Sequence, residues 1–394
     1  MNVVFLFLSF NGIGKDRGMY GDLVCEYAQR GYNVYVIAPS KNKREFIEDD
    51  ANIKIKWVNS LSLLGVGFIT KAIANLLLPY VILKASKDFL PKKVNLVISP
   101  TPPITLTGVV KKIKKQYNAK FYLILRDIFP QNAVDLGLIR PNSLVYKYFR
   151  RKEKKLYELA DMIGCMSQGN IDYILHHNPK IVPQKVEILP NWVDVKKEFK
   201  NCNSNFLRSH NLKGKFIAIF GGNLGIAQNP SNIIDLAELY KDNNEIVFLI
   251  IGKGIFKKQI ENMIKTRNLS NVIMFDYIPR DEYEPLASSC NVGLVSLNGN
   301  FTIPNIPSRT LGYWQASLPI FAIIDKNTDF GLNVLDKHKG GVWCIEGDLK
   351  QYKEKFDLLY KNYELAKKMG DNGYQALLKE YNVESIVDII SSHD

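Results

Sequence analysis

Residues 219–239 read IFGGNLGIAQNPSNIIDLAEL, and their pattern indicates the fold class. An apolar run ends at Gly221 and Gly222, and a polar loop follows it. Beyond the loop, apolar residues recur at the spacing of a helix that is buried on one face: Ile233, Ile234, Leu236, Ala237 and Leu239. This order predicts a strand, a tight loop and a helix. Because it begins more than halfway along a chain of 394 residues, we interpret it as the start of a second Rossmann-like domain.

The rest of the chain alternates in the same way. In the first half, apolar runs predict strands at 3–10, 33–39, 52–58, 94–99, 121–125, 162–167 and 186–189. Helical patterns lie between most of them, and Gly31 closes the one over 19–30. The second half predicts strands at 216–221, 246–251, 272–275, 292–296, 320–324 and 341–344. We therefore expect an α/β protein with two doubly wound parallel sheets.

A polar, irregular segment separates the two series and predicts a linker near 191–200. We expect an N-terminal domain over 1–195, a C-terminal domain over 196–375, and a C-terminal helix within 376–394 that returns to the N-terminal domain. In open α/β sheets, ligands bind beyond the carboxyl ends of the strands. The expected site is therefore the cleft between the two domains.

The net charge of +13 is concentrated in one half of the chain. Residues 1–200 hold 31 Lys and Arg against 17 Asp and Glu, whereas residues 201–394 hold 21 against 22. The excess gathers in KKIKK (111–115) and RRKEKK (150–155). Such runs suit an anionic membrane surface or nucleic acid, and the alternative for each run is a solvated helix face.

Cysteine usage and apolar segments bear on the compartment. The five cysteines are scattered without a C-x-x-C pair, which predicts reduced thiols in a cytoplasmic protein. The start, MNVVFLFLSFNG, lacks the basic region and cleavage site of a signal peptide. Residues 61–83 are long enough to span a membrane, but Lys71 and Pro79 interrupt them. A membrane span, a helix facing the membrane surface or an acceptor lipid, and an ordinary core helix all remain open.

Two loops of the first domain are candidate ligand contacts. NGIGKDRGM (11–19) places Gly14 and Gly18 just before a helix, where backbone can approach an anion. Its spacing differs from a dinucleotide fingerprint, and strand 33–39 lacks a terminal acid, so NAD is disfavoured. LRDIFP (125–130) places Arg126 and Asp127 at a strand end, where they could orient a hydroxyl or a phosphate. The alternatives are a structural turn and a capping Asp with a surface Arg.

Two loops of the second domain are stronger candidates. In GGNLGIAQN (221–229), backbone N–H groups would face a helix start, and Asn223 and Gln228 add neutral donors, which suits a diphosphate. In IPNIPSRTLGYWQASLP (303–319), Ser308, Arg309 and Thr310 fall at the first turn of a helix. A hydroxyl, a guanidinium and free N–H groups at one helix terminus form a phosphate clamp. The alternative is a capped helix with an exposed arginine.

With this last loop a family resemblance becomes specific. The chain resembles the GT-B glycosyltransferases of glycosyltransferase family 4, and within them the bacterial surface-polysaccharide branch that includes N-acetylfucosamine-type transferases. The resemblance covers essentially the whole chain. It rests on the order of NGIGKDRG, VCEYAQRGYNVYVIAP, LRDIFPQNAVDLG, ILPNWVD, FGGNLGIAQNPSNIIDLAEL, IPSRTLGYWQASLPIFA and MGDNGYQALLKEYNVESI.

The resemblance implies two Rossmann-like domains that face a central cleft. The nucleotide and diphosphate would lie mostly on the C-terminal domain, and the acceptor mostly on the N-terminal, membrane-facing domain. Arg309 would replace the phosphate-binding Lys usual in a PSK motif, and Arg126 and Asp127 would orient acceptor or donor hydroxyls. The remaining donor-binding residues carried over by position are Gly14, Gly18, Met19, Gly222, Asn223, Gln228, Tyr277, Ile278, Ser308 and Thr310.

The sequence departs from the family pattern at three places. Where the family often has His-Asp, this chain has Arg126-Asp127. Where many members have two glutamates, it has Pro304 and Gly312. Where an Arg and a Lys are common, it has Asn223 and Gln228. These changes point to an altered donor, a different catalytic arrangement or low activity.

The resemblance implies a retaining glycosyltransferase that moves a sugar from a nucleotide diphosphate donor, expected to be UDP-linked, to a lipid-diphosphate-linked acceptor. The product would belong to a surface polysaccharide such as O-antigen or capsule. We expect the protein in the cytoplasm, peripheral on the inner face of the cell membrane. No cofactor and no metal are expected, because the acidic cluster EDD (48–50) lies in a polar connection rather than at a strand end.

Two rival classes have weaker support. A sugar-nucleotide epimerase on the same fold would need acidic or histidine acid–base groups in the cleft, which the sequence does not obviously supply. A basic nucleic-acid-binding protein would explain the charge, but no recognition motif or aromatic–glycine platform is present, so no nucleic-acid partner is expected.

Overall fold

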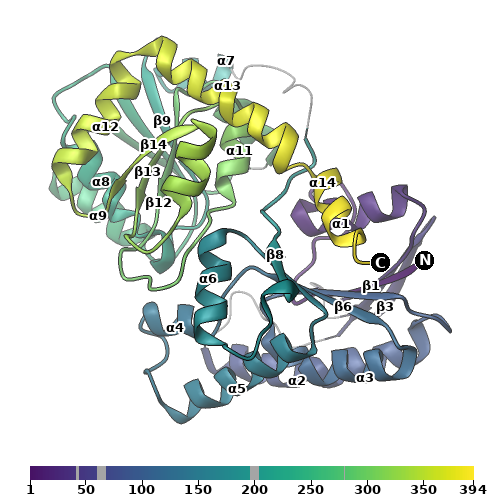
Figure 1. The fold of residues 1–394 in the computed structure, drawn as a ribbon. Coiled ribbons are helices and arrows are strands. Elements are labelled where there is room, and N and C mark those ends of the chain that lie inside the picture. Colours follow the sequence, from purple (N-terminus) through teal and green to yellow (C-terminus); the bar gives the residue numbers. More distant parts are fainter. Residues whose placement is uncertain (41–43, 60–67, 196–203, 279) are drawn as a thin grey trace. The chain divides into compact units, whose positions relative to one another are not determined.

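The computed structural model describes residues 1–40, 44–59, 68–195, 204–278 and 280–394 (Figure 1). The chain divides into two compact units. The first unit is Met1–Asp194 together with Val383–Asp394, and the second unit is Val195–Asn382. Each unit has its own sheet and its own hydrophobic core.

The first unit contains an eight-stranded sheet in the order β3-β4-β2-β1-β5-β6-β7-β8. Every pairing is parallel except that of β3 with β4. The strands are β1 (Asn2–Leu6), β2 (Asn33–Pro39), β3 (Phe46–Asp50), β4 (Ile53–Val58), β5 (Leu96–Pro100), β6 (Lys120–Leu125), β7 (Met162–Cys165) and β8 (Val186–Ile188). All seven strands predicted for this half are present, and the α/β fold class is confirmed.

Strand β3 corrects the sequence-based interpretation of residues 46–50. We expected a polar connection around EDD (48–50), but these residues form an antiparallel edge strand beside β4. Glu48 accepts a hydrogen bond from Nε1 of Trp57 at 2.9 Å. Because neither face of this edge strand is buried, it lacks the apolar pattern from which strands are predicted.

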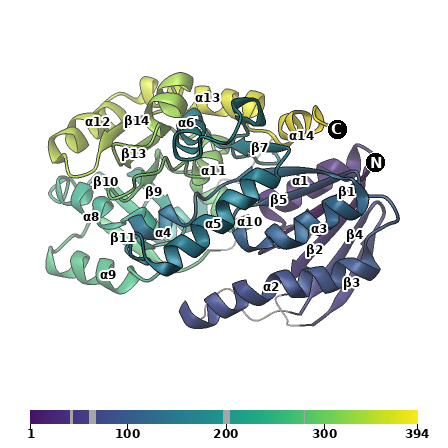
Figure 2. The ribbon, with the colours of Figure 1, turned by 60° about the horizontal axis from the view of Figure 1, so that its bottom comes forward.

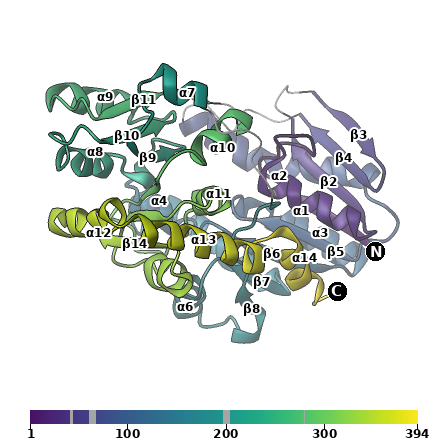
Figure 3. The ribbon, with the colours of Figure 1, turned by 90° about the horizontal axis from the view of Figure 1, so that it is seen from above.

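Helices cover both faces of the first sheet. They are α1 (Gly18–Gln29), α2 (Phe68–Phe89), α3 (Thr107–Tyr117), α4 (Gln131–Asp135), α5 (Leu144–Leu159), α6 (Gln168–His177) and α14 (Val383–Ser391). Helices α1 and α14 pack side by side on one face (Figure 3), and α2, α3 and α5 lie together on the other (Figure 2). As predicted, Gly31 follows the end of α1, with a φ of +83°.

Two predicted segments extend beyond the described residues. Of the apolar stretch 61–83, residues 61–67 lie outside the described structure, and the remainder belongs to α2, in which Leu78 and Ile82 are buried. No helix among the described residues has the length and apolar character needed to cross a membrane. Of the predicted linker 191–200, residues 196–200 lie outside the described structure. Trp192 is buried in the first unit and donates from Nε1 to the carbonyl of Met19 at 2.7 Å.

The second unit contains a six-stranded, wholly parallel sheet in the order β11-β10-β9-β12-β13-β14. The strands are β9 (Phe216–Gly221), β10 (Ile246–Ile251), β11 (Val272–Phe275), β12 (Val292–Ser296), β13 (Ile320–Ile324) and β14 (Gly341–Ile345). Five of these match the predicted ranges residue for residue, and β14 is one residue longer. The strand order reverses between β9 and β12, which creates a topological switch point at their carboxyl ends.

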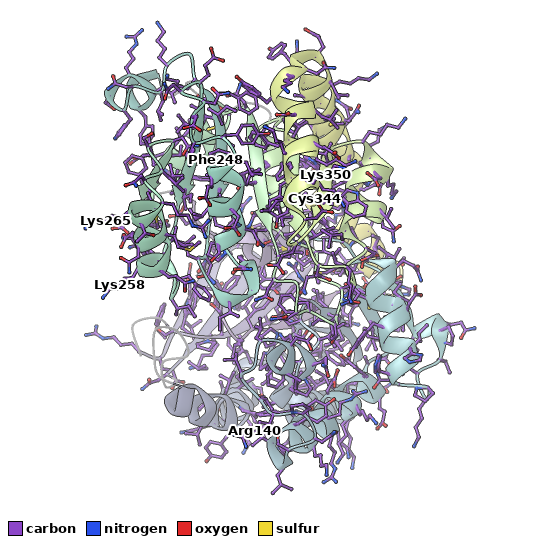
Figure 4. All side chains as sticks on the ribbon, turned by 90° about the vertical axis from the view of Figure 1, so that its left-hand side faces the viewer. Arg140, Phe248, Lys258, Lys265, Cys344 and Lys350 are labelled. Atoms are coloured by element: carbon purple, nitrogen blue, oxygen red, sulfur yellow. The ribbon has the colours of Figure 1, made fainter. Side chains whose placement is uncertain are left out.

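The helices of the second unit are α7 (Ser204–Ser209), α8 (Ser231–Glu238), α9 (Lys257–Thr266), α10 (Arg280–Ala287), α11 (Arg309–Gln315), α12 (Leu349–Lys361) and α13 (Tyr363–Glu380). Phe356 of α12 packs against Phe248 of β10 and Phe321 of β13. Figure 4 shows Phe248 inside the unit and Lys258 and Lys265 extending away from α9. Helix α13 ends at Glu380. The segment that belongs to the first unit begins at Val383, within the predicted 376–394.

Candidate functional site

A cavity of about 460 Å³ lies at the carboxyl ends of β9, β10 and β11 in the second unit. Its lining residues come from three strand ends and from α10: Gly221, Gly222, Asn223, Ile251, Gly252, Lys253, Tyr277, Ile278 and Tyr283. Four residues predicted from the sequence are therefore brought together here, namely Gly222, Asn223, Tyr277 and Ile278. The position agrees with the rule that open α/β sheets bind ligands beyond their carboxyl edge.

Glycine backbone forms the floor of the cavity. A Cβ atom on Gly252 would lie 1.9 Å from the carbonyl oxygen of Gly222, so these two strand ends touch through their main chains. Gly222 has a φ of +131°, a conformation that residues with a side chain rarely adopt. Glycine is thus required at both positions, and the floor stays open to a ligand.

The loop after β9 differs in one respect from the expectation. The N–H groups of Gly222, Leu224 and Gln228 donate to the carbonyls of Ile251, Lys253 and Gly225, respectively. The loop continues into a 3₁₀ turn at Ile226–Gln228, and α8 begins only at Ser231. Gly222 is therefore not followed directly by a helix start, because this turn intervenes.

Asn223 and Gln228 converge above Gly225. A Cβ atom on Gly225 would lie 2.6 Å from Nδ2 of Asn223 and 3.3 Å from Oε1 of Gln228. Oε1 of Gln228 is buried and has no hydrogen-bond partner in the described structure. The two predicted neutral side chains thus lie together over Gly225, and of the two Asn223 lines the cavity.

Arg309 provides the positive charge beside this floor. Helix α11 begins at Arg309, so Arg309 and Thr310 lie in its first turn and Ser308 directly precedes it. Cζ of Arg309 lies 4.1 Å from the centroid of the Phe220 ring. A Cβ atom on Gly222 would lie 3.4 Å from Nη2 of Arg309, so the guanidinium borders the glycine loop. Nη1 is buried and has no hydrogen-bond partner among the described residues.

The guanidinium of Arg309 has no carboxylate partner in the described part of the chain. Burial lowers its pKa, and the groups that oppose this shift are the hydroxyls of Tyr313 and Tyr283. An arginine remains charged at neutral pH even so. The unit therefore holds a fixed positive charge, without a counter-ion, next to an open backbone surface.

The residues on either side of Arg309 have different environments. Ser308 is exposed and its side chain makes no cap hydrogen bond to α11. Thr310 is buried, and its Oγ1 lacks a partner within the described structure. Helix α11 has only seven residues, so its dipole is weak beside the full charge of the guanidinium.

Sequence reasoning missed Tyr283, Tyr313 and Lys253. A Cβ atom on Gly221 would lie 2.0 Å from the hydroxyl of Tyr283, and the hydroxyl of Tyr313 accepts a hydrogen bond from Gly221 N–H at 3.0 Å. Lys253 belongs to a Gly-Lys-Gly run that follows strand 246–251, just as two glycines follow strand 216–221. That repeated pattern of glycines at strand ends was the signal that could have identified Lys253.

Two acids at neighbouring strand ends hold the loops around the site. Glu346, directly after β14, accepts a hydrogen bond from Asn232 at 2.9 Å and also hydrogen-bonds with Asn229 and the N–H of Gly299. It thereby joins the loop after β9 to the loop after β12. The sequence offered a signal here as well, because Asp325 directly follows the predicted strand 320–324 and Glu346 lies two residues after the predicted strand 341–344.

Asp325, directly after β13, is the second of these acids. Its Oδ1 accepts hydrogen bonds from the N–H groups of Asn327 and Thr328, each at 2.8 Å. Oγ1 of Thr328 in turn donates to the carbonyl of Asn305 at 2.7 Å, within the loop that leads to Arg309. Burial raises the pKa of Asp325 to about 6.

The predicted residues of the first unit form a separate group. Nη1 of Arg126 lies 2.8 Å from Sδ of Met19, and Cζ of Arg126 lies 5.8 Å from the ring centroid of Trp192. The backbone N–H groups of Arg126 and Asp127 both donate to Oγ1 of Thr101, at 3.0 and 3.2 Å. The side chain of Asp127 is exposed. Arg126, Asp127 and Met19 therefore meet at the carboxyl edge of the first sheet.

The glycine loop of the first unit is held by an arginine. Arg17 pairs with Asp22 at 2.7 Å and with Asp194 at 2.6 Å, which fixes the start of α1. Gly18 has a φ of +63°. A Cβ atom on Gly14 would have no other atom within 4 Å, so the space around this glycine is open. In the described structure, no group of three or more His, Cys, Asp or Glu side chains is placed to hold a metal ion.

The fold agrees with that of known sugar transferases. The chain superposes on a sucrose-phosphate synthase from Thermosynechococcus elongatus with a TM-score of 0.77 and 13% identity, over 100% of this chain and 98% of that one. It also superposes on HepE of Anabaena, solved in complex with UDP, with a TM-score of 0.69 and 13% identity, over 100% and 99% of the two chains. The protein has the GT-B glycosyltransferase fold.

Two family models match consecutive parts of the chain. Glycosyltransferase Family 4 matches residues 20–197, and Glycosyl transferases group 1 matches residues 203–376. The chain therefore carries a family 4 glycosyltransferase domain followed by a group 1 glycosyltransferase domain, and its curated relatives include bacterial glycosyltransferases.

Two of these relatives show the level of similarity. A probable glycosyltransferase, WbjE, of Pseudomonas aeruginosa is 24% identical over 64% of this chain and 63% of its own length. The N-acetylgalactosamine-N,N'-diacetylbacillosaminyl-diphospho-undecaprenol 4-alpha-N-acetylgalactosaminyltransferase of Campylobacter jejuni is 31% identical over 37% of each chain. The matched part thus spans less than two thirds of either relative.

Proposed function

We propose that this protein is a retaining glycosyltransferase that moves a sugar from a nucleoside diphosphate donor, UDP-linked, to a lipid-diphosphate-linked acceptor in bacterial surface-polysaccharide synthesis. Within the family we assign it to the branch that includes N-acetylfucosamine-type transferases, with an O-antigen or capsule as the product. The single observation that carries the proposal is the unpaired guanidinium of Arg309 beside the open glycine floor of the cavity.

The chemistry follows from the charge of the leaving group. When the bond between the sugar C1 and the donor phosphate breaks, its electron pair remains on the diphosphate. The acceptor oxygen forms the new bond to C1 on the same face, and the departing phosphate takes the acceptor proton. A fixed cation stabilises the developing charge because it needs no reorganisation during the reaction. Arg309 has that role in this proposal, and no cofactor or metal is invoked.

Known proteins supply support for each substrate. HepE, which shares the fold, was solved in complex with UDP. The Campylobacter relative acts, according to its name, on a diphospho-undecaprenol acceptor. Tyr277, whose side chain is 66% exposed at the cavity, offers a ring on which a nucleobase can stack.

We further propose that the first unit binds the acceptor and docks on the inner face of the cell membrane, from the cytoplasm. Helices α3 and α5 are adjacent, and Lys111, Lys112 and Lys115 are exposed on α3. On α5, Arg150 and Glu153 form a structural pair at 2.5 Å, but Arg151, Lys154 and Lys155 are exposed. Exposed lysines and arginines near a surface attract anionic lipid.

A panel of nucleotides tests the donor assignment. We expect UDP to raise the melting temperature of the wild-type protein in a concentration-dependent way, because a ligand that binds only the folded state stabilises it. GDP and ADP serve as comparisons for the base. A protein that no nucleoside diphosphate stabilises would contradict the proposed function.

Vesicle sedimentation tests the membrane assignment. Vesicles with anionic lipid should retain the protein at low salt and release it at high salt, because salt screens surface charge. A variant in which Lys111, Lys112 and Lys115 are replaced by Gln should bind less, whereas replacement of Lys258 and Lys265 on α9 by Gln is the control. Equal binding to neutral vesicles would argue against electrostatic docking.

A further inference from the structure

Lys253 is a cation of the cavity that the family resemblance does not assign. It follows Gly252 at the end of β10, and it lines the cavity together with Asn223 and Tyr277. Its Nζ lies 5.7 Å from the centroid of the Tyr277 ring. The side chain therefore extends along the cavity rather than away from it.

The register of the sheet places Lys253 between the two ends of the site. Ile251 is opposite Gly221 on one side and Phe275 on the other. Two residues further along the strands, Lys253 is thus flanked by the glycine loop after β9 and by Tyr277 after β11. The carbonyl of Lys253 accepts a hydrogen bond from Leu224 N–H at 2.8 Å, which fixes this position.

The charge of Lys253 is not neutralised in the described part of the chain, where no carboxylate lies within ion-pair distance of its Nζ. The nearby carboxylate of Asp276 hydrogen-bonds with Lys257, and this contact lowers the pKa of Asp276, with a smaller contribution from Lys253. Asp276 is therefore already paired.

We propose that Lys253 binds the donor phosphate that is attached to the ribose, while Arg309 binds the phosphate that is attached to the sugar. This inference rests on the proposed function and adds the second cation of the site. Arg309 borders Gly222 at one end, Tyr277 marks the base at the other, and Lys253 lies between them. A ligand that spans this edge places its ribose-proximal phosphate within reach of Lys253.

Nucleotides of different length test the assignment by titration calorimetry. With UDP and UMP as probes, Lys253→Met should raise the dissociation constant of both ligands by the same factor, about tenfold, the low end for one hydrogen bond to a charged group. Arg309→Ala should raise that of UDP more than that of UMP. Lys253→Arg should restore most of the affinity, and the affinity of Lys253→Met should depend less on salt than that of the wild type.

Lys258→Met is the matched control, because it removes the same charge from an exposed side chain of α9 and leaves the Lys257–Asp276 pair intact. We expect its UDP affinity to stay within about twofold of the wild type. If Lys253→Met behaves like this control, or weakens UDP and leaves UMP unchanged, the assignment of Lys253 is overturned. If the wild type binds neither UDP nor another nucleoside diphosphate, the proposed function fails first, so the two failures are distinguishable.

Discussion

Arg126 in the first unit and Arg309 in the second unit both lie at the carboxyl edge of a parallel sheet, near an aromatic ring. Arg126 is next to Asp127 in sequence and contacts the sulfur of Met19 at 2.8 Å. Arg309 borders the backbone of Gly222 and the ring of Phe220, and its Nη1 is buried without a partner in the described structure.

This difference separates two kinds of site. The group around Arg126 offers both a charge and an exposed carboxylate, which suits hydroxyl groups. The group around Arg309 offers an uncompensated charge and a backbone floor, which suits a phosphate. Net charge alone would place the phosphate site in the first unit, since residues 1–200 carry the basic excess. The location of single unpaired cations is therefore more informative than the total charge.

The largest expected effect contrasts the two arginines. Arg309→Ala should reduce kcat/KM by roughly 30- to 1000-fold, corresponding to about 2–4 kcal/mol of transition-state stabilisation. Arg126→Ala should reduce turnover with acceptor but leave UDP affinity within about twofold. Steady-state kinetics and calorimetry on both variants measure this. Full activity of Arg309→Ala, or equal loss of UDP binding in both variants, would remove the distinction.

A second test contrasts a crowded glycine with an open one. Gly252→Ala should lower the free energy of unfolding by about 1–3 kcal/mol, as overpacking does, because its Cβ would lie 1.9 Å from the oxygen of Gly222. Gly14→Ala should change that free energy by less than about 0.5 kcal/mol, since nothing lies within 4 Å of its Cβ. Urea denaturation of both variants provides the measurement. A Gly252→Ala protein with wild-type stability and UDP affinity would show that the floor is not closely packed.

The smallest expected effect concerns the acid behind Arg309. The pKa of Asp325 is raised to about 6, so the folded state binds more protons than the unfolded state, and stability falls as the pH rises from about 4 to about 6. Asp325→Asn keeps the Oδ1 acceptor and removes the titration. The free energy of unfolding of the variant minus that of the wild type should be larger at pH 8 than at pH 5 by roughly 1 kcal/mol. The same difference at both pH values would contradict the burial of this carboxylate.

The sheets were predictable because their strands are buried on both faces. The runs 216–221, 246–251, 272–275, 292–296 and 320–324 coincide with β9 to β13, since a parallel strand covered by helices must be apolar throughout. Strand β3 escaped prediction because it pairs with only one neighbour and exposes Phe46 and Ile47. The other edge strands, β8, β11 and β14, are more buried than β3 and were predicted.

The candidate site was predictable only in part. Arg309 and Gly222 were identified because a basic residue at a helix start and glycines after a strand are local patterns. Tyr283 and Lys253 were not, because their role depends on the close approach of three strand ends. The 3₁₀ turn before α8 was also missed, since the helical spacing beyond Ile233 does not show where the helix begins.

Local sequence patterns were sufficient to predict the parallel strands of two α/β sheets, the glycines at their edges and the arginine in the first turn of α11, because burial and backbone conformation select residue types locally. Only the folded structure shows that Gly222 touches Gly252, that Asp276 is paired with Lys257, and that Lys253 and Arg309 have no carboxylate partner in the described part of the chain. Ion pairing and cavity shape depend on which distant strands become neighbours, and composition does not specify those neighbours.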